Sequence, residues 1–302
     1  MEQVKEIVII KEVQVVGVAN LSNRHELINQ DEPMSDVQDI KVQKRKASRL
    51  RHGEAFLQRY EDGVCQAASE LRLSVVIPIG SNEDTCWLGL KESLLYLPKE
   101  TEVIFVLAKG FERAHFDTIF TELSHLKFSV YTSEPGRAIQ LNLGALKARA
   151  PWLWFLHADC RFSKVSAQKL FQFLRDNADP NLLLYFDLRF LSDGPLFMTV
   201  NSIGVWIRSH LLGLPFGDQG FCMRKEVFVK LGKFPTGCRY GEDHLFVWKA
   251  NRCGVKVRSV GAFIYTSARK YKDKGWARTT CLHLYLTFKQ AIPQLLMPLF
   301  SK

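Results

Sequence analysis

The chain has 302 residues and an apolar fraction of 47%, which are enough for the core of one large α/β domain or two smaller ones. Its formal net charge is +10 at pH 7. Its seven cysteines include no CxxC pair and no Cys/His set at zinc spacing, which argues against a structural zinc site and favours reduced thiols in the cytosol. No uninterrupted apolar stretch is long enough to cross a bilayer and charges interrupt the apolar N-terminus, so we expect neither a membrane-spanning helix nor a signal peptide.

Residues 1–70 differ in character from the rest of the chain. The Val- and Ile-rich residues 7–18 favour a strand or hairpin, and the polar residues 20–46 show no period and are typical of a disordered linker. Apolar residues recur at helical spacing between positions 49 and 71. We expect an N-terminal extension, partly disordered or accessory, with no function that its residues identify.

A regular alternation of strand and helix begins at Leu73. The predicted strands are residues 73–78, 102–107, 127–131 and 152–156, and the predicted helices between them are 85–95, 114–123 and 136–150. This alternation predicts an α/β fold with a mostly parallel sheet and helices on both faces. Ligands of such sheets bind beyond the carboxyl ends of the strands, where Pro78, Ala108 and Asp159 lie in the sequence.

The pattern is looser after Asp159. Residues 182–188 predict a strand, 195–212 a helix, and 255–260 and 262–265 two late strands. Between them, the stretch "YGEDHLFVWKANRCG" (240–254) begins with two acids and continues as an amphipathic helix. Residues 71–302 are therefore expected to form the main domain, ending in a basic helical tail.

Acids recur at three points of the second half: Asp159, Asp218 and the pair Glu242–Asp243. One acid at a strand end can bind a hard divalent cation, with phosphate oxygens and water completing its coordination. A second acid from another element can take a proton from an acceptor hydroxyl. The alternatives are that Asp159 caps a helix over residues 162–174, and that Glu242 and Asp243 only favour a helix N-terminus.

Seven segments in this order carry a resemblance: "SVVIPIGSNED" (74–84), "PGRAIQLNLGALKA" (135–148), "FLHAD" (155–159), "FDLRF" (186–190), "GDQGFCMRKEVFVKLGKFP" (217–235), "GED" (241–243) and "TSARKYKDKGWARTT" (266–280). Together they resemble glycosyltransferase family 2, which has the GT-A fold, a Rossmann-like sheet flanked by helices. Within that family the chain is most similar to a bacterial subgroup with His-Ala-Asp in place of Asp-x-Asp. The resemblance covers about residues 73–295.

The resemblance implies a metal-dependent, inverting transfer of a sugar from a nucleotide-diphosphate sugar to a hydroxyl. Asp159 would hold Mg²⁺ or Mn²⁺, and Asp243, beside Glu242, would be the general base. His157 replaces the first acid of the motif and is a metal ligand or, as we prefer, a strand-end histidine bonded to backbone. The implied donor-binding residues are Pro78, Asn82, Glu83, Arg137, Asn142, Gly144, His157 and Ala158. Asp218 and Gln219 would lie at the acceptor or the donor sugar, and Arg269 and Arg278 would bind phosphate.

One departure from the family concerns the nucleobase. The family usually places an Asp after the second strand, where this chain has Ala108 and Lys109 in "VLAKGF" (106–111). The alternative reading is therefore a degenerate member that binds a nucleotide or a partner without turnover. A sugar nucleotidyltransferase fits less well because "PIGSNED" lacks a Gly-rich loop.

The positive charge is concentrated at the end of the chain. Residues 251–302 hold ten Lys and Arg and a single acid, Asp273, whereas residues 1–70 hold ten bases and twelve acids. Such a field favours a phosphorylated ligand, an anionic membrane or nucleic acid, and no recognition motif supports nucleic acid. The acceptor is unidentified, a small molecule or lipid-like. We expect a cytoplasmic protein. For residues 276–300 the interpretations are peripheral contact at the inner membrane face, closure over a lipid-like acceptor or, as we prefer, a C-terminal helix packed on the domain.

Overall fold

The computed structural model describes residues 73–81, 88–111, 122–177, 179–238 and 240–300, with the side chains of the last four residues excepted. All of these residues belong to the compact unit Leu57–Lys302. The predictions for residues 1–70, for Asn82 and Glu83 and for most of the helix at 114–123 lie outside the described residues.

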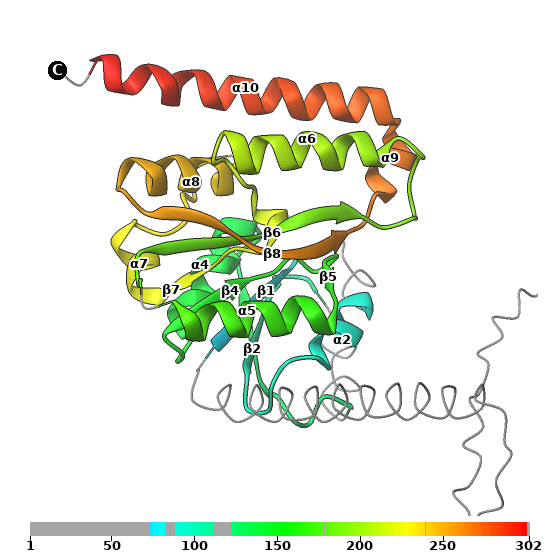
Figure 1. The fold of residues 1–302 in the computed structure, drawn as a ribbon. Helices are drawn as coiled ribbons and strands as arrows, with labels where there is room; N and C mark the ends of the chain where they lie inside the picture. Colours follow the sequence, from blue (N-terminus) through cyan, green and yellow to red (C-terminus); the bar gives the residue numbers. More distant parts are fainter. Residues whose placement is uncertain (1–72, 82–87, 112–121, 178, 239, 301–302) are drawn as a thin grey trace, which may run out of the picture. The chain divides into compact units, whose positions relative to one another are not determined.

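A curled sheet with the strand order β3-β2-β1-β4-β7-β6-β8-β5 forms the centre of the molecule (Figure 1). Strands β1 to β4 are mutually parallel, as are β6 and β8, whereas β7 and β5 are antiparallel to their neighbours. The strand bounds are β1 Leu73–Ile79, β2 Glu102–Ala108, β3 Lys127–Ser133, β4 Trp152–Phe155, β5 Arg161–Phe162, β6 Leu182–Phe190, β7 Cys222–Arg224 and β8 Lys256–Thr266.

Helices cover both faces of this sheet (Figure 1). On one face lie α2 and α5, and on the other lie α4, α6, α7 and α8, with α10 farther from the sheet on that side and α9 at its start. The helix bounds are α2 Leu88–Leu94, α4 Arg137–Lys147, α5 Lys164–Asp176, α6 Met198–Leu211, α7 Lys225–Lys230, α8 Glu242–Arg252, α9 Arg269–Lys274 and α10 Trp276–Phe300.

Successive residues of the central strands enter two different cores. In β1, Val75 and Ile77 pack with α2 and α5, whereas Val76 packs with α4 and α8. This alternation follows from the period of two along a strand. All seven residues of β1 are buried, and this is why five of the seven are apolar, Ser74 and Pro78 being the exceptions.

The first four predicted strands and the helix after the third are confirmed, with ends that differ by a few residues. The two late strands are in fact one, β8, in which Gly261 has a positive φ of 71°. The helix after Asp159 is capped by Ser163, whose hydroxyl accepts from the Ser166 N–H at 3.1 Å. The interpretation of Asp159 as that helix's cap is therefore wrong.

Candidate functional site

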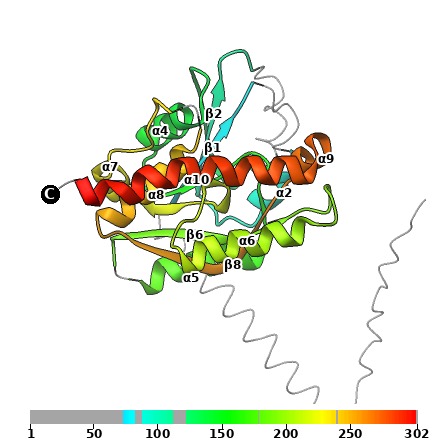
Figure 2. The same cartoon turned by 90° about the horizontal axis from the view of Figure 1, so that it is seen from above.

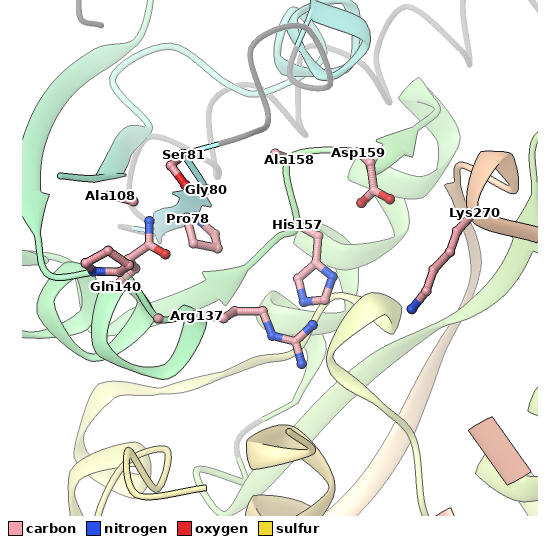
Figure 3. A pocket seen from close by; sticks show the side chains of 12 residues that line it. Pro78, Gly80, Ser81, Ala108, Arg137, Gln140, His157, Ala158, Asp159 and Lys270 are labelled. Atoms are coloured by element: carbon pink, nitrogen blue, oxygen red, sulfur yellow. The ribbon is translucent and has the colours of Figure 1, made fainter. Parts of the chain in front are cut away.

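A cavity of about 490 Å³ lies at the carboxyl ends of β1, β2 and β4 (Figure 3). The N-terminus of α4 and one residue of α9 complete its wall. Five of the expected site residues line it: Pro78, Arg137, His157, Ala158 and Asp159. The other lining residues are Gly80, Ser81, Ala108, Pro135, Gly136, Gln140 and Lys270.

The N-terminus of α4 opens into this cavity. Gly136 is its N-cap, with a φ of 141° that disfavours a side chain, and no side chain caps the helix end. The positive end of a helix dipole and backbone N–H groups therefore lie at the cavity wall. That combination favours an anion, phosphate above all.

Arg137 joins the cavity to the two acids of the GED segment. Its Nε donates to Glu242 Oε1, and its Nη2 lies 3.7 Å from Asp243 Oδ1. Both carboxylates are buried, and they occupy the first turn of α8. The acids thus lie at a helix N-terminus, as the simpler interpretation expected, and also form ion pairs across the fold.

Asp243 is held as a carboxylate. Burial alone would raise its pKa, but the charge of Arg137 and the N–H of Gly217, 2.6 Å from Oδ2, outweigh burial and lower the pKa below its ordinary value. Its Oδ1 also accepts from the His244 N–H at 2.9 Å. A side chain at Gly217 would start 3.0 Å from Asp243 Oδ2, so the close approach of this backbone requires glycine.

His157 is a neutral imidazole. Burial, assisted by the charge of Arg137, lowers its pKa to about 3, although Asp243 acts in the opposite direction. Its ring lies between the Asp159 carboxylate and the Arg137 guanidinium (Figure 3). A neutral imidazole here can donate or accept a hydrogen bond, or offer a nitrogen to a metal.

Asp159 projects into the cavity from the loop after β4 (Figure 3). Its Oδ2 accepts from the Thr266 hydroxyl at 3.1 Å. Burial raises the pKa of this carboxyl, and Thr266, Arg269 and Arg137 act against that rise. No group of three or more His, Cys, Asp or Glu residues within the described ranges is placed to hold a metal ion. A cation at Asp159 would thus depend on ligand oxygens and water for its remaining positions.

Two lining residues escaped the sequence analysis. Lys270, in the first turn of α9, directs its ammonium group toward the space below Asp159 (Figure 3). Burial, then Lys274 and Arg137, lower its pKa. Gln140 donates to the carbonyls of Ile79 at 2.8 Å and Val106 at 2.7 Å, so it fixes the ends of β1 and β2 at the cavity floor. The sequence signal for Lys270 is its position next to Arg269 in the segment "TSARKYKDKGWARTT" (266–280).

Several expected site residues lie outside the cavity wall. Asn142 bonds both backbone groups of Phe234, and a side chain at Gly144 would meet Val76 at 2.3 Å, so this glycine permits helix-to-sheet packing. Gln219 is buried and uses its amide on Phe216, Ser209, Arg208 and the Phe186 carbonyl. Arg269 and Arg278 are exposed, in α9 and α10.

Asp218 and Arg208 lie outside the cavity wall and close enough for their charges to interact. Its Oδ1 and the Nη1 of Arg208 are buried without a hydrogen-bond partner among the described residues. Burial raises the pKa of Asp218 to about 6 and lowers that of Arg208 to about 10. Each charge acts against the effect of burial on the other, because Arg208 lowers the pKa of Asp218 and Asp218 raises that of Arg208. Cζ of Arg208 also lies over the Phe216 ring, 3.2 Å from its centroid.

Comparison with known proteins finds similarity to glycosyltransferases. No family model matches the sequence. A curated relative, an uncharacterized glycosyltransferase of Haemophilus influenzae, is 25% identical over 122 residues, which are 38% of this chain and 40% of that protein. The chain therefore spans well under two thirds of the relative's length.

Two solved structures share the architecture. The mannosyltransferase PcManGT from Pyrobaculum calidifontis, in complex with GDP-Man and Mn²⁺, has a TM-score of 0.58 and 19% identity over 74% of this chain and 64% of that one. Residues 1–349 of S. aureus TarS, in complex with UDP, have a TM-score of 0.50 and 18% identity over 65% of this chain and 60% of that one. The chain thus has the mixed α/β, GT-A-like fold of these glycosyltransferases, as the sequence predicted.

Proposed function

We propose that the protein is a glycosyltransferase that moves a sugar from a nucleotide-diphosphate donor to an acceptor hydroxyl with inversion. The observation that carries this proposal is the convergence of Arg137, Lys270, the α4 N-terminus and Asp159 on one cavity at the carboxyl ends of the strands. Three positive features and one carboxylate match a diphosphate accompanied by a divalent cation. Membership of family 2, in the His-Ala-Asp subgroup, belongs to the same proposal.

The donor diphosphate is proposed to lie against the N-terminus of α4. Arg137 binds it with the planar fork that suits phosphate oxygens, and Lys270 adds a point charge from the opposite side of the cavity (Figure 3). The similar Pyrobaculum and S. aureus structures contain GDP-Man and UDP, which supports a nucleotide-linked donor without specifying its base or sugar.

Mg²⁺ or Mn²⁺ fits Asp159 as its protein ligand. A hard cation that keeps several waters and takes phosphate oxygens needs only one or two carboxylates. When bound, the ion neutralises charge on the departing diphosphate. His157, a neutral imidazole beside Asp159, either offers a nitrogen to that ion or donates to a phosphate oxygen.

Asp243 is proposed as the general base. The acceptor oxygen forms a bond to the anomeric carbon, the bond to the diphosphate oxygen breaks with its electron pair, and the hydroxyl proton passes to Asp243. Arg137 holds this carboxylate before the donor binds. When phosphate oxygens compete for the guanidinium, the pKa of Asp243 rises and its Oδ1 becomes available, so donor binding prepares the base.

The acceptor is proposed to be a hydroxyl compound, small or lipid-like. It would enter beside Asp243 from the side of α6, where Asp218 and Arg208 leave a buried carboxylate oxygen and a buried guanidinium nitrogen without protein partners among the described residues. A hydroxyl can donate to the first and accept from the second.

Nucleotide binding without turnover is the second candidate. Ala108 lines the cavity at the end of β2, and Lys109 pairs with Glu134 at the surface, so neither supplies the carboxylate that would contact a nucleobase there. This departure affects recognition of the base, whereas Arg137, Asp159 and Asp243 all remain.

Release of nucleoside diphosphate from a panel of nucleotide sugars, with Mn²⁺ or Mg²⁺, tests the proposal. We expect metal-dependent release with at least one donor, abolished by Asp159→Asn and retained by the control Asp179→Asn, which alters a surface ion pair with Lys256. Nucleotide binding by calorimetry with no release from any donor would establish the second candidate instead.

A further inference from the structure

Helix α6 exposes a row of apolar side chains. Met198, the first residue of the helix, is buried, but Ile203 is 55% exposed and Leu211 is 69% exposed. The exposed apolar residues recur every three or four positions, which places most of them on one side of the helix, and two more precede it. They are Leu196, Phe197, Val200, Ile203, Trp206, Ile207 and Leu211.

Helix α10 exposes a second apolar row. Phe288 is 62% exposed and Tyr285 is 60% exposed, and the same spacing continues from one turn to the next. The full set is Leu282, Leu284, Tyr285, Phe288, Ile292, Leu295 and Leu296. Scattered surface apolar residues are ordinary, but five on α6, two just before it and seven on α10 are not.

The two helices lie on the same side of the sheet. Figures 1 and 2 show α6 and α10 running in the same direction, with α6 over β6 and β8 and with α10 farther from the sheet, over α8. Their first turns are in contact, because Trp276 Nε1 donates to Asn201 Oδ1 at 2.6 Å and Asn201 Nδ2 donates to Thr280 Oγ1 at 3.1 Å. We refer to the exposed apolar residues of both helices as the apolar face.

The charge around this face is mostly positive. Neither α6 nor α10 contains Asp or Glu, and α9 contributes four cations against Asp273. Lys272, Lys274 and Lys289 are exposed, and Lys289 Nζ lies 5.9 Å from the centroid of the Tyr285 ring. A partner must therefore offer an apolar interior and a negative surface.

We infer that the apolar face docks on the surface of an anionic phospholipid bilayer. Acyl chains would cover the apolar side chains, anionic headgroups would meet the lysines, and Trp206 and Tyr285 would lie at the level of the headgroups. No helix in the described ranges has the length and apolar character that spanning needs, so the contact is peripheral. Anionic lipids of the cytoplasmic leaflet supply the complementary charge.

Docking in this way would bring the membrane close to the cavity. Lys270 lines the cavity, and its Nζ lies 3.2 Å from Nε2 of His283 in α10. The Tyr271 hydroxyl lies 3.2 Å from Nδ1 of the same ring. The short helix α9 therefore links the cavity wall to the apolar face. The inference goes beyond the proposed function and holds whether or not the cavity catalyses transfer.

Flotation of the full chain with vesicles tests the inference without donor or metal. We expect binding to vesicles of phosphatidylcholine with phosphatidylglycerol, little binding to phosphatidylcholine alone, and release by salt. Replacement of Lys272 and Lys274 by Ala should lower the partition coefficient about fivefold for each cation removed. Equal binding to neutral and anionic vesicles would contradict the charge argument.

The contribution of the apolar side chains to vesicle binding is tested with separate variants. The pair Ile203→Asp and Phe288→Asp should abolish vesicle binding, whereas the control Val165→Asp, on α5 at the opposite face of the sheet, should not. Val165 is 58% exposed, so it matches Ile203 and Phe288 in exposure. Circular dichroism and the melting temperature verify that each variant folds. Unchanged binding by the folded pair would overturn the inference.

Fluorescence provides a second test with a conservative variant. Brominated lipid should quench the tryptophan fluorescence of the wild type, and Trp206→Phe should remove part of that quenching while binding persists. A second copy of the chain is the rival occupant of the face. If the wild type is a dimer by light scattering, Ile203→Asp with Phe288→Asp is a monomer, and neither binds vesicles, the bilayer inference is wrong.

Discussion

Arg137 Nη2 lies 3.7 Å from Asp243 Oδ1, and the same guanidinium lines the cavity that we assign to the donor. One side chain therefore contacts both the candidate base and the candidate phosphate site. This relationship explains how a buried carboxylate can remain charged before substrate arrives. It also means that charge at the two sites is coupled.

Arg137→Met should destabilise the chain at neutral pH. Glu242 and Asp243 would lose their cation while remaining buried, which costs 3–5 kcal/mol for a fully buried pair. Because the Arg137 side chain is 41% exposed, we expect a smaller loss of about 2 kcal/mol. Urea unfolding measures this loss.

The stability lost in Arg137→Met should depend on pH, and this dependence serves as the control for the prediction. Arg137 lowers the pKa of Asp243, so their pairing stabilises the fold above the ordinary carboxyl pKa and loses this contribution as the pH falls through the folded-state pKa. The difference between wild type and Arg137→Met should therefore shrink as the medium is acidified. A difference that stays constant with pH would show that the pair does not stabilise the fold.

Asp159→Asn should separate activity from stability. Burial raises the pKa of this carboxyl, so its protonated form stabilises the fold fully below the ordinary carboxyl pKa, and this contribution is lost as the pH rises through the raised folded-state pKa. At neutral pH the ionised form therefore opposes folding. The amide should leave the melting temperature unchanged or raise it, while metal-dependent transfer falls about 100-fold or more. A large fall in the melting temperature would instead indicate a structural role.

His157→Gln should weaken the acid sensitivity of folding. The unfolded chain takes up a proton at this residue near pH 6.5, whereas the folded chain does so only at about 3. Stability contributed by the neutral ring is thus present above 6.5 and is lost as the pH falls between these values. The slope of unfolding free energy against pH, measured near pH 5, should decrease by about 1.4 kcal/mol per unit in the variant. An unchanged slope would contradict the buried neutral assignment.

Lys270→Met should weaken donor binding more than turnover. One charge-assisted contact to phosphate contributes about 1.5 kcal/mol, so we expect the KM for the donor to rise about tenfold with a smaller change in kcat. The control is Lys272→Met, in the same short helix but outside the cavity wall. Equal effects of the two substitutions on KM would indicate general electrostatics.

The sequence predicted the first half of the fold better than the second. Strands β1, β2 and β4 are buried runs bounded by turns, and such runs have a strong local signal. Strands β7 and β5 have three and two residues, which is too short for any period. Their antiparallel pairing depends on partners that are distant in the chain, so it could not be inferred locally.

The same difference applies to the candidate site. Pro78, Ala108 and Asp159 lie at the ends of predicted strands, so the rule for parallel sheets predicted that they would lie close together, and the resemblance implied His157 and Ala158. The pairing of Arg137 with Glu242 joins residues 105 positions apart and has no local signal. Lys270 and Gln140 also depend on tertiary placement, through α9 and through the carbonyls of two strands.

Anomalous diffraction from crystals soaked with Mn²⁺ and a nucleoside diphosphate tests the central claim most directly. We expect a manganese peak at coordination distance, about 2.0–2.2 Å, from an Asp159 oxygen, with phosphate beside the α4 N-terminus and Arg137. The peak should disappear in Asp159→Asn crystals. Nucleotide bound in the cavity with manganese elsewhere, or with no manganese, would contradict the account.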